Sequence, residues 1–231
     1  MTLQQLPLGF VLRDDATFAS FLPNGNEQIL NALAKHIQGI GDHFIYVWGS
    51  IGSGRSHLLQ ATCHAAQEYR QTALYLPLED YNTLSIELLN GLEHIDLVCI
   101  DDIEKIATNP IWEEQLFHLF NRIRANGKRL IIAADAPPTS LKIILPDLKS
   151  RLSWGVVYQL NSLDDDQKLA ALQLRAQIRG LDLEAAVGKF LLRRFTRNMA
   201  QLFMVLEQLD QASLAEQRRL TIPFVKEVLG V

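Results

Sequence analysis

Cysteine is scarce in this sequence, which excludes a fold built on disulfides. Only Cys63 and Cys99 occur among 231 residues, and both lie within apolar stretches. We expect two buried free thiols in a reducing compartment rather than a disulfide. The 6 histidines show no metal-binding spacing with cysteines or carboxylates. His57 and His64 share one face of a predicted helix, where we expect packing or surface exposure rather than metal binding.

Long hydrophobic runs and basic blocks are also missing. No stretch approaches the roughly 18 uninterrupted apolar residues of a membrane span, and the first residues are not a basic segment followed by an apolar core. We therefore expect a cytoplasmic protein without a membrane partner. The net charge of −4 and the pI of about 5.9 disfavour direct binding of duplex DNA. The densest basic cluster fits a solvated helix face and a phosphate sensor equally; it consists of Arg193, Arg194 and Arg197.

Apolar segments typical of strands alternate with helical patterns as far as residue 160. The expected strands lie near 43–48, 72–77, 95–101, 129–134 and 156–160. The expected helices lie near 26–38, 55–70, 83–91 and 111–126. Buried strands that alternate with helices indicate a parallel sheet covered on both faces. We predict an α/β nucleotide-binding domain over residues 13–161, preceded by a tail, residues 1–12, without regular period.

The pattern becomes purely helical after residue 160. Three aspartates at 164–166 supply negative charge to the start of a helix that we expect to end at Gly180. Further helices are expected near 184–195, 198–214 and 223–229. We therefore predict a small all-helical domain over residues 162–231.

A glycine-rich loop connects the first expected strand with a helix and follows the G-x-x-x-x-G-K-[ST] pattern, except that arginine replaces lysine. Backbone N–H groups of such a loop surround a phosphate, and the following helix N-terminus adds partial positive charge. The alternative is a glycine-rich turn that binds no ligand. The expected nucleotide contacts are Gly49, Ser50, Gly52, Ser53, Gly54, Arg55, Ser56 and His57.

Two of these side chains have distinct expected roles. Arg55 would reach the terminal phosphates, and the Ser56 hydroxyl would bind a magnesium ion. Because a guanidinium is planar and larger than an ammonium, nucleotide binding can persist while the geometry for hydrolysis is lost.

A second motif lies about 50 residues later, where the apolar run 95–100 ends in Asp101 and Asp102. In a Walker B segment the first acid holds magnesium and the second, usually glutamate, polarises the attacking water. Asp102 is one methylene shorter, which disfavours a role as the base but leaves it beside the nucleotide. A buried strand that simply ends in aspartate is the alternative for Asp101.

Two more polar residues are placed where a phosphate could be sensed. Asp135 ends the expected strand 129–134, although an aspartate at a strand-to-turn junction needs no ligand. Arg151 lies in a short helix predicted within 146–155, before a turn. An arginine displayed there could act on a neighbour's nucleotide, a contribution of about 10³–10⁵ in rate where such fingers operate. A surface salt bridge is the alternative.

Taken in order, these motifs and the helical end resemble an AAA+ module, and within that class the DnaA-related proteins and their short Hda group. The resemblance spans nearly the whole chain, and arginine in the phosphate loop is itself a mark of the Hda group. The segments that carry it are 14–21, 54–59, 97–101, 148–155 and 220–227.

The resemblance gives the tail a role. Gln5, Leu6, Leu8 and Phe10 are similar to the short peptide by which such proteins dock on the DNA polymerase sliding clamp, although Gly9 and Phe10 depart from its usual ending. An extended segment with apolar anchors can fill a preformed groove while the glutamine forms hydrogen bonds at the rim.

The resemblance also implies a regulatory function. Proteins of this group, held on the DNA-loaded clamp, promote hydrolysis of the ATP bound to DnaA and so prevent a second initiation. Arg151 matches their arginine finger. The nucleotide of this chain, ADP or another nucleoside diphosphate with room for Mg²⁺ at Ser56 and Asp101, would be a structural ligand. The lid arginine that usually senses phosphate falls on Ala200, and Arg197 is the candidate substitute.

Arg55, Asp102 and Ala200 together disfavour robust ATP turnover by this chain. The resemblance then implies an activator of hydrolysis in DnaA rather than an ATPase. The implied partners are DnaA and the clamp, with DNA reached only through the clamp and a location at the nucleoid and replisome. A homodimer is compatible with the AAA+ class. One alternative is a free-standing AAA+ ATPase of the helicase-loader type. Another is a DNA-binding initiator fragment, which the charge and the lack of DnaA's helix-turn-helix domain disfavour.

Overall fold

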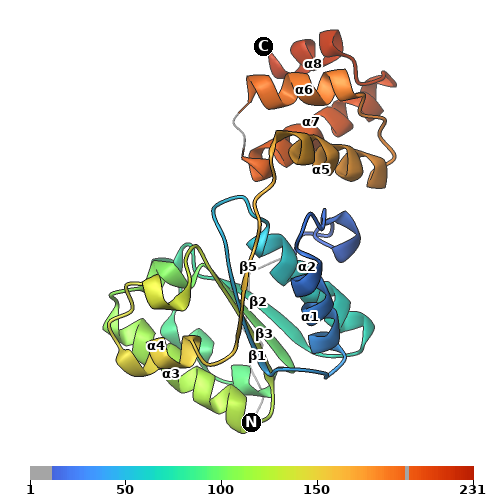
Figure 1. Ribbon diagram of the computed structural model, residues 1–231. Helices are drawn as coiled ribbons and strands as arrows, with labels where there is room; N and C mark the ends of the chain where they lie inside the picture. Colours follow the sequence, from blue (N-terminus) through green and yellow to red (C-terminus); the bar gives the residue numbers. More distant parts are fainter. Residues whose placement is uncertain (1–11, 196–197) are drawn as a thin grey trace.

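A single parallel sheet forms the centre of the α/β domain (Figure 1). The computed structural model describes residues 12–195 and 198–231. The strand order is β2-β3-β4-β1-β5, and every neighbouring pair is parallel. The strands are β1 Phe44–Trp48, β2 Ala73–Pro77, β3 Leu97–Asp101, β4 Arg129–Ala134 and β5 Val156–Gln159. The prediction of a parallel sheet is therefore confirmed.

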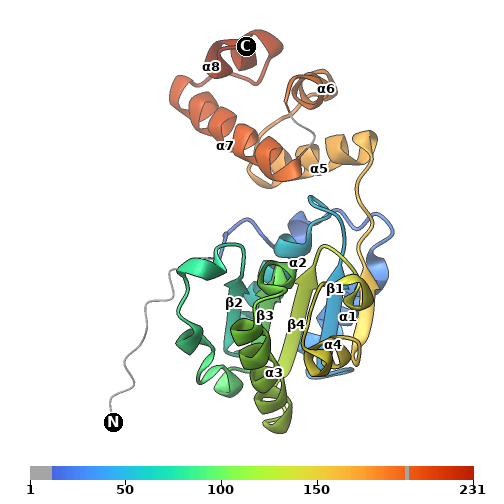
Figure 2. The same ribbon diagram turned by 90° about the vertical axis from the view of Figure 1, so that its left-hand side faces the viewer.

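Helices cover both faces of this sheet (Figures 1 and 2). Helices α1 (Glu27–Ile37) and α2 (Arg55–Glu68) pack on one face, whereas α3 (Pro110–Ala125) and α4 (Pro146–Leu152) pack on the other. Strand β1 is apolar throughout because its side chains enter both layers. Ile45 and Val47 join the core below α1 and α2, and Phe44 and Tyr46 join the core below α3 and α4.

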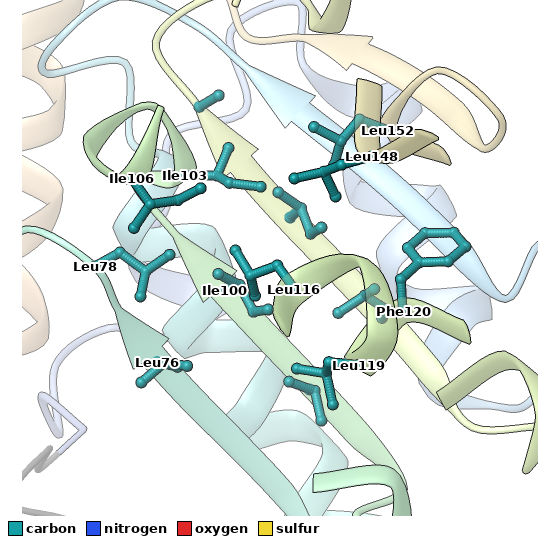
Figure 3. Packing of buried hydrophobic residues seen from close by; sticks show 14 of the residues in the cluster. Leu76, Leu78, Ile100, Ile103, Ile106, Leu116, Leu119, Phe120, Leu148 and Leu152 are labelled. Atoms are coloured by element: carbon teal, nitrogen blue, oxygen red, sulfur yellow. The ribbon is translucent and has the colours of Figure 1, made fainter. Parts of the chain in front are cut away.

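The core under α3 and α4 determines where α4 lies (Figure 3). Leu148 and Leu152 of α4 are buried in the same cluster as Leu116 and Phe120 of α3. The fully buried Glu113 carboxylate accepts hydrogen bonds from the backbone N–H groups of residues 144 and 145, at 2.9 and 2.7 Å. These bonds fix the chain just before α4, and a buried carboxylate needs such donors.

The prediction of a helix over residues 83–91 is wrong. This segment contains two short 3-10 turns, η2 Tyr81–Thr83 and η3 Ile86–Leu89. Leu84 and Ser85 between them are extended, with ψ of 139° and 135°, and Gly91 has a φ of +84°. A segment of this length needs tertiary packing along one face to be helical, and here burial is limited to single side chains such as Leu89. Further 3-10 turns are η1 Phe18–Ser20, η4 Leu92–His94, η5 Ile103–Ile106 and η6 Pro138–Ser140.

The helices after β5 form a lid with a core of its own. They are α5 Asp165–Ile178, α6 Ala185–Arg194, α7 Met199–Glu216 and α8 Ile222–Leu229. Helix α5 starts in a capping box, in which Asp164 and Gln167 each accept from the other's backbone N–H at 2.8 Å. Leu172, Leu202 and Phe224 are among the fully or nearly fully buried residues that join the four helices.

Residues 13–21 connect the lid with the α/β domain. The Asp15 carboxylate lies 2.5 Å from Nη2 of Arg175 in α5, and Nη1 of Arg175 donates to the Asp15 carbonyl oxygen. On the other side, the Arg13 N–H donates to Oε1 of Gln60 in α2 at 3.0 Å. The segment therefore links the helix that follows the phosphate loop to the first lid helix.

Cys63 and Cys99 are buried and unpaired, which confirms the prediction of free thiols. Among the described helices, none combines the length and the hydropathy needed to cross a bilayer.

Candidate nucleotide-binding site

A cavity of about 450 Å³ lies where the carboxyl ends of β1, β3 and β4 face the lid. In open α/β sheets this edge is the usual place for ligands. The loop after β1, the acids after β3 and β4, and the start of α7 all contribute to it. The lining residues are Arg13, Ile51, Gly52, Gly54, Arg55, Ser56, His57, Glu79, Asp102, Glu104, Lys105, Asp135, Asn198, Met199, Ala200 and Phe203.

The loop between β1 and α2 requires its glycines. Gly54 has a φ of +97°, and a Cβ there would lie 2.7 Å from the ring of Phe21. A Cβ on Gly49 would lie 2.6 Å from Oγ of Ser53 and 3.1 Å from the backbone oxygen of Leu160. The loop thus turns tightly against its neighbours, and the spacing of its glycines has a steric cause.

Two polar atoms at the loop are buried without a hydrogen-bond partner among the described residues. They are Oγ of Ser53 and Nη1 of Arg55. A buried donor without an acceptor is costly, and such atoms call for a ligand or water. A phosphate group fits because it carries several acceptor oxygens and negative charge. The residues present therefore fit a nucleotide whose phosphates bind the loop around Arg55.

The other terminal nitrogen of Arg55 is occupied by acids. Nη2 lies 3.1 Å from Oδ1 of Asp102 and 3.8 Å from Oε1 of Glu104. Burial, together with the carboxylates of Asp101 and Glu104, raises the pKa of Asp102 to about 7, even though Arg55 lowers it. Burial also raises the pKa of Glu104. Two acids thus share one terminal nitrogen of Arg55, and that side of the guanidinium is engaged by the protein itself.

Asp101, the predicted magnesium ligand at the end of β3, lies just beneath the cavity. It is fully buried, and its two oxygens accept from the Tyr75 hydroxyl at 2.8 Å and from the Asp102 N–H at 3.0 Å. Ser56 lines the cavity, whereas Asp101 does not. Within the described part of the chain no group of three or more metal-binding side chains occurs. The magnesium roles of Ser56 and Asp101 therefore stay predictions.

The remaining predicted contacts divide into two groups. Asp135 lines the cavity, and its N–H donates to Oε2 of Glu104 at 3.3 Å. The Ser50 hydroxyl, in contrast, lies 2.6 Å from that of Ser162, in the connection to the lid. His57 lines the cavity but also holds the chain: its Nε2 lies 2.8 Å from the Thr17 carbonyl oxygen, and burial lowers the pKa of His57 to about 4. The neutral ring donates to Thr17.

Several lining residues were not predicted from the sequence. The lid contributes Asn198, Met199 and Phe203 beside Ala200, and the α/β domain contributes charged side chains. Glu104 could have been predicted as a site residue, because it lies three residues after the strand end at Asp101. Arg13 and Glu79 could not have been predicted from the sequence, since only the tertiary fold brings them to the loop. The unpredicted charged residues are Arg13, Glu79, Glu104 and Lys105.

Arg151 lies away from this cavity. It occupies the last turn of α4 and is half-buried, and its guanidinium carbon is 5.9 Å from the ring centroid of Trp154. That ring also stacks with Arg124, whose guanidinium carbon is 3.8 Å from the centroid. Arg151 is not among the residues that line the cavity of its own chain.

Five predicted residues lie outside the described part of the chain. Arg197, the candidate substitute for the lid arginine, is one of them. The four predicted clamp contacts are the others: Gln5, Leu6, Leu8 and Phe10.

A parallel sheet of this order, a glycine-rich phosphate loop after β1 and a four-helix lid over the cavity together define a P-loop module of the AAA+ class. Comparison with known families then narrows the class. Residues 12–159 match the model of the bacterial DnaA ATPase domain, and residues 165–229 match that of the Hda lid domain. The chain belongs to the bacterial DnaA ATPase family and carries a lid of the Hda type, which makes it a DnaA-related replication regulator.

Solved structures agree on the fold. Domain III of the Thermotoga maritima replication initiation protein DnaA superposes with a TM-score of 0.77 at 21% identity, over 96% of this chain and 98% of that one. AMPPCP-bound DnaA from Aquifex aeolicus gives 0.70 at 22% identity, over 86% and 66%. The RuvB branch migration motor of Thermotoga maritima gives 0.65 at 13% identity, over 91% and 69%. At these identities the likeness concerns the fold alone.

Proposed function

We propose that the chain is a nucleotide-bound regulator of replication initiation that docks on the sliding clamp and promotes hydrolysis of ATP bound to DnaA. The observation that carries the proposal is the position of Arg151. It lies at the end of α4, outside the cavity of its own chain, in the Ser-Arg-Leu setting that matches the arginine finger of related proteins. An arginine in that position is available to a nucleotide on a neighbouring molecule.

In this proposal the chain's own nucleotide is a structural ligand. The loop would hold its phosphates through backbone N–H groups, Ser53 and Arg55, while Phe203 and Met199 provide apolar surface from the lid. A bound nucleoside diphosphate would stabilise the closed arrangement of lid and loop, because it contacts both. Asp102 is engaged with Arg55, so it is poorly placed to activate water.

The chemical step occurs on the partner. The guanidinium of Arg151 would neutralise charge that develops on the terminal phosphate of DnaA-bound ATP. Its aromatic neighbour Trp154, itself stacked with Arg124, restricts where Arg151 can point. The protein would act in the cytoplasm at the replisome, and it would reach DNA only through the clamp.

A reconstitution tests the whole proposal. ATP hydrolysis by DnaA is measured with this protein, the clamp and DNA, and one component at a time is left out. Full stimulation should require all of them. Equal hydrolysis in the absence of this protein would contradict the regulatory function.

The tail gives a separate prediction. Replacing Gln5, Leu6 and Leu8 together by alanine should weaken binding to the clamp at least about tenfold, because such anchors provide most of a short peptide's binding energy. Surface plasmon resonance on immobilised clamp measures it. The matched control is Thr2→Ala with Gln4→Ala, which alters the same tail outside the proposed anchors. Equal weakening by both sets would contradict the assignment of the anchors.

The alternative is a free-standing AAA+ ATPase of the helicase-loader type, and the observation that favours it is a phosphate loop that faces the acid Asp102 across the same cavity. It predicts ATP turnover at ordinary ATPase rates, about 1 s⁻¹ or more, by the purified protein alone. The engagement of Arg55 with Asp102 and Glu104 argues for a much lower rate. Release of phosphate in the absence of DnaA and clamp separates the two functions.

A further inference from the structure

Glu113 is an acidic side chain in the first turn of α3 that is fully buried. Its oxygens accept hydrogen bonds from three backbone N–H groups. Oε2 accepts from Leu145 at 2.7 Å and from Ile144 at 2.9 Å, and Oε1 accepts from Thr108 at 2.8 Å. A buried carboxylate is costly unless donors surround it, and a fully satisfied buried group specifies one arrangement of its neighbours. Glu113 therefore joins the turn before α3 to the chain that enters α4.

The carboxylate is held on a rigid element. Helix α3 has 16 residues and a side-chain cap, in which Oδ1 of Asn109 accepts from the Trp112 N–H at 3.3 Å. Trp112 and Leu116 bury the inner face of the helix in the core. Thr108 has a φ of +69°, an outlier for a β-branched residue, and its hydrogen bond to Glu113 helps to hold this turn. Glu113 is thus a fixed reference point at the start of α3.

The start of α4 has no cap of its own. The helix has 7 residues, and the side chain of its N-cap residue Leu145 forms no capping hydrogen bond. Leu148 and Leu152 of α4 are buried in the core under α3 (Figure 3). Apolar burial has no preferred direction, so it permits a small tilt of the helix. The hydrogen bonds to Glu113 are directional, and they determine how the chain enters α4.

We infer that Glu113 is a positioning residue for Arg151, because it fixes the start of the helix whose last turn carries the guanidinium. The inference rests on the proposed function of Arg151. The rise of the helix places Arg151 about 9 Å beyond Leu145, so a tilt of about 10° at the start moves it by more than about 1 Å. A misplacement of about 1 Å costs on the order of 10²-fold in rate.

The experiment measures hydrolysis of ATP preloaded on DnaA while the concentration of this protein, assembled with clamp and DNA, is varied. Glu113→Gln keeps the shape but turns an amide N–H toward backbone N–H groups, so the chain before α4 loses part of its acceptor. The maximal stimulated rate should fall on the order of 10²-fold. The concentration for half-maximal stimulation should change by less than about threefold, because a misplaced finger affects the chemical step and not docking. ADP binding should be unchanged, since Glu113 does not line the cavity.

Two control variants separate positioning from general effects. Ile37→Ala removes a buried side chain from α1, on the opposite face of the sheet, and shows the effect of lost stability. Glu68→Gln removes an exposed negative charge at the end of α2. Both should keep the maximal rate, and thermal unfolding verifies that each variant is folded.

Hydrogen exchange gives a structural readout of the same variants. In Glu113→Gln the backbone amides of residues 144–152 should exchange at least about tenfold faster than in the wild type, while β4 keeps its protection. A general loss of stability would instead raise exchange in both segments.

Three results would overturn the inference. One is a wild-type maximal rate in Glu113→Gln although residues 144–152 exchange faster. Another is an equal fall in Ile37→Ala, which would assign the effect to stability. The third is a change in the half-maximal concentration alone, which would assign Glu113 to docking. If Glu113→Gln does not fold, Glu113→Asp replaces it, because its carboxylate is one methylene shorter and should lower the maximal rate by a smaller factor.

Failure of the proposed function has a different signature. Full stimulation by Arg151→Ala would contradict the proposed function, and Glu113 would then have no finger to position. Loss of stimulation in Arg151→Ala with a wild-type maximal rate in Glu113→Gln would contradict only the positioning role.

Discussion

Replacement of Arg151 by alanine should reduce the stimulated hydrolysis of DnaA-bound ATP about 10³-fold or to the unstimulated rate. The loss is large because no other described side chain in the last turn of α4 carries a guanidinium. Arg151→Lys should also fall well below the wild-type rate, since an ammonium cannot form two parallel hydrogen bonds to phosphate oxygens. The reconstituted assay with clamp and DNA measures both, in single-turnover form with labelled ATP preloaded on DnaA.

The control variant is Lys35→Ala, which removes one exposed positive charge from α1, on the opposite face of the sheet (Figure 1). It should retain full stimulation. Clamp binding and ADP binding should be normal in both Arg151 variants, because Arg151 belongs to neither site. Full stimulation by Arg151→Ala would remove Arg151 from the mechanism and leave the fold and family assignment in place.

The fold was predictable because its strands are buried on both faces. Runs such as 44–48 and 97–100 are apolar on both faces of the strand, and a parallel sheet covered by helices on both sides produces that pattern. The prediction of a helix over residues 83–91 failed because the apolar residues of this segment pack one at a time instead of forming a helical face. The phosphate loop was predictable because steric demands at Gly49 and Gly54 are local.

The electrostatics of the site could not be predicted in the same way. The engagement of Arg55 depends on the left-handed backbone at Asp102 and on the position of Glu104 in η5, which no periodicity encodes. Arg13 and Phe203 reach the cavity from segments far apart in the sequence. In the sequence Arg55 is simply a substitute for lysine. The structure shows that Nη2 faces Asp102 and Glu104, while Nη1 is buried without a partner among the described residues.

Asp15→Asn should lower the free energy of unfolding by about 3 kcal/mol, the low end of the range for breaking a buried ion pair. Arg175 is only 2% exposed, and Asp15 is its anionic partner at 2.5 Å. The same carboxylate lies 3.1 Å from Nη2 of Arg179. Asparagine removes the carboxylate that faces the buried Arg175, whereas Arg179 keeps Asp210 at 3.5 Å and Glu207 at 3.7 Å. The Asp15 side chain keeps 21% exposure, which limits the loss. Denaturant titration followed by circular dichroism measures it.

Asp14→Asn is the matched control, since it removes the adjacent, exposed carboxylate and should change stability by less than about 0.5 kcal/mol. The double variant Asp15→Asn with Arg175→Met should recover part of the loss, because it removes the unpaired buried charge. Additive losses in the double variant would show that the two residues act independently.

The pH dependence of Asp15→Asn identifies the ion pair as the cause. Burial alone would raise the pKa of Asp15, but the guanidiniums of Arg175, Arg13 and Arg179 lower it below its ordinary value of 3.8. A carboxyl group with a lowered pKa in the folded state stabilises the fold above its ordinary pKa, and this stabilisation is lost as the pH falls through the folded value. The stability difference between wild type and Asp15→Asn should therefore be constant above about pH 5 and shrink below about pH 4. A difference that stays constant down to pH 2 would assign the loss to packing at the lid instead of charge.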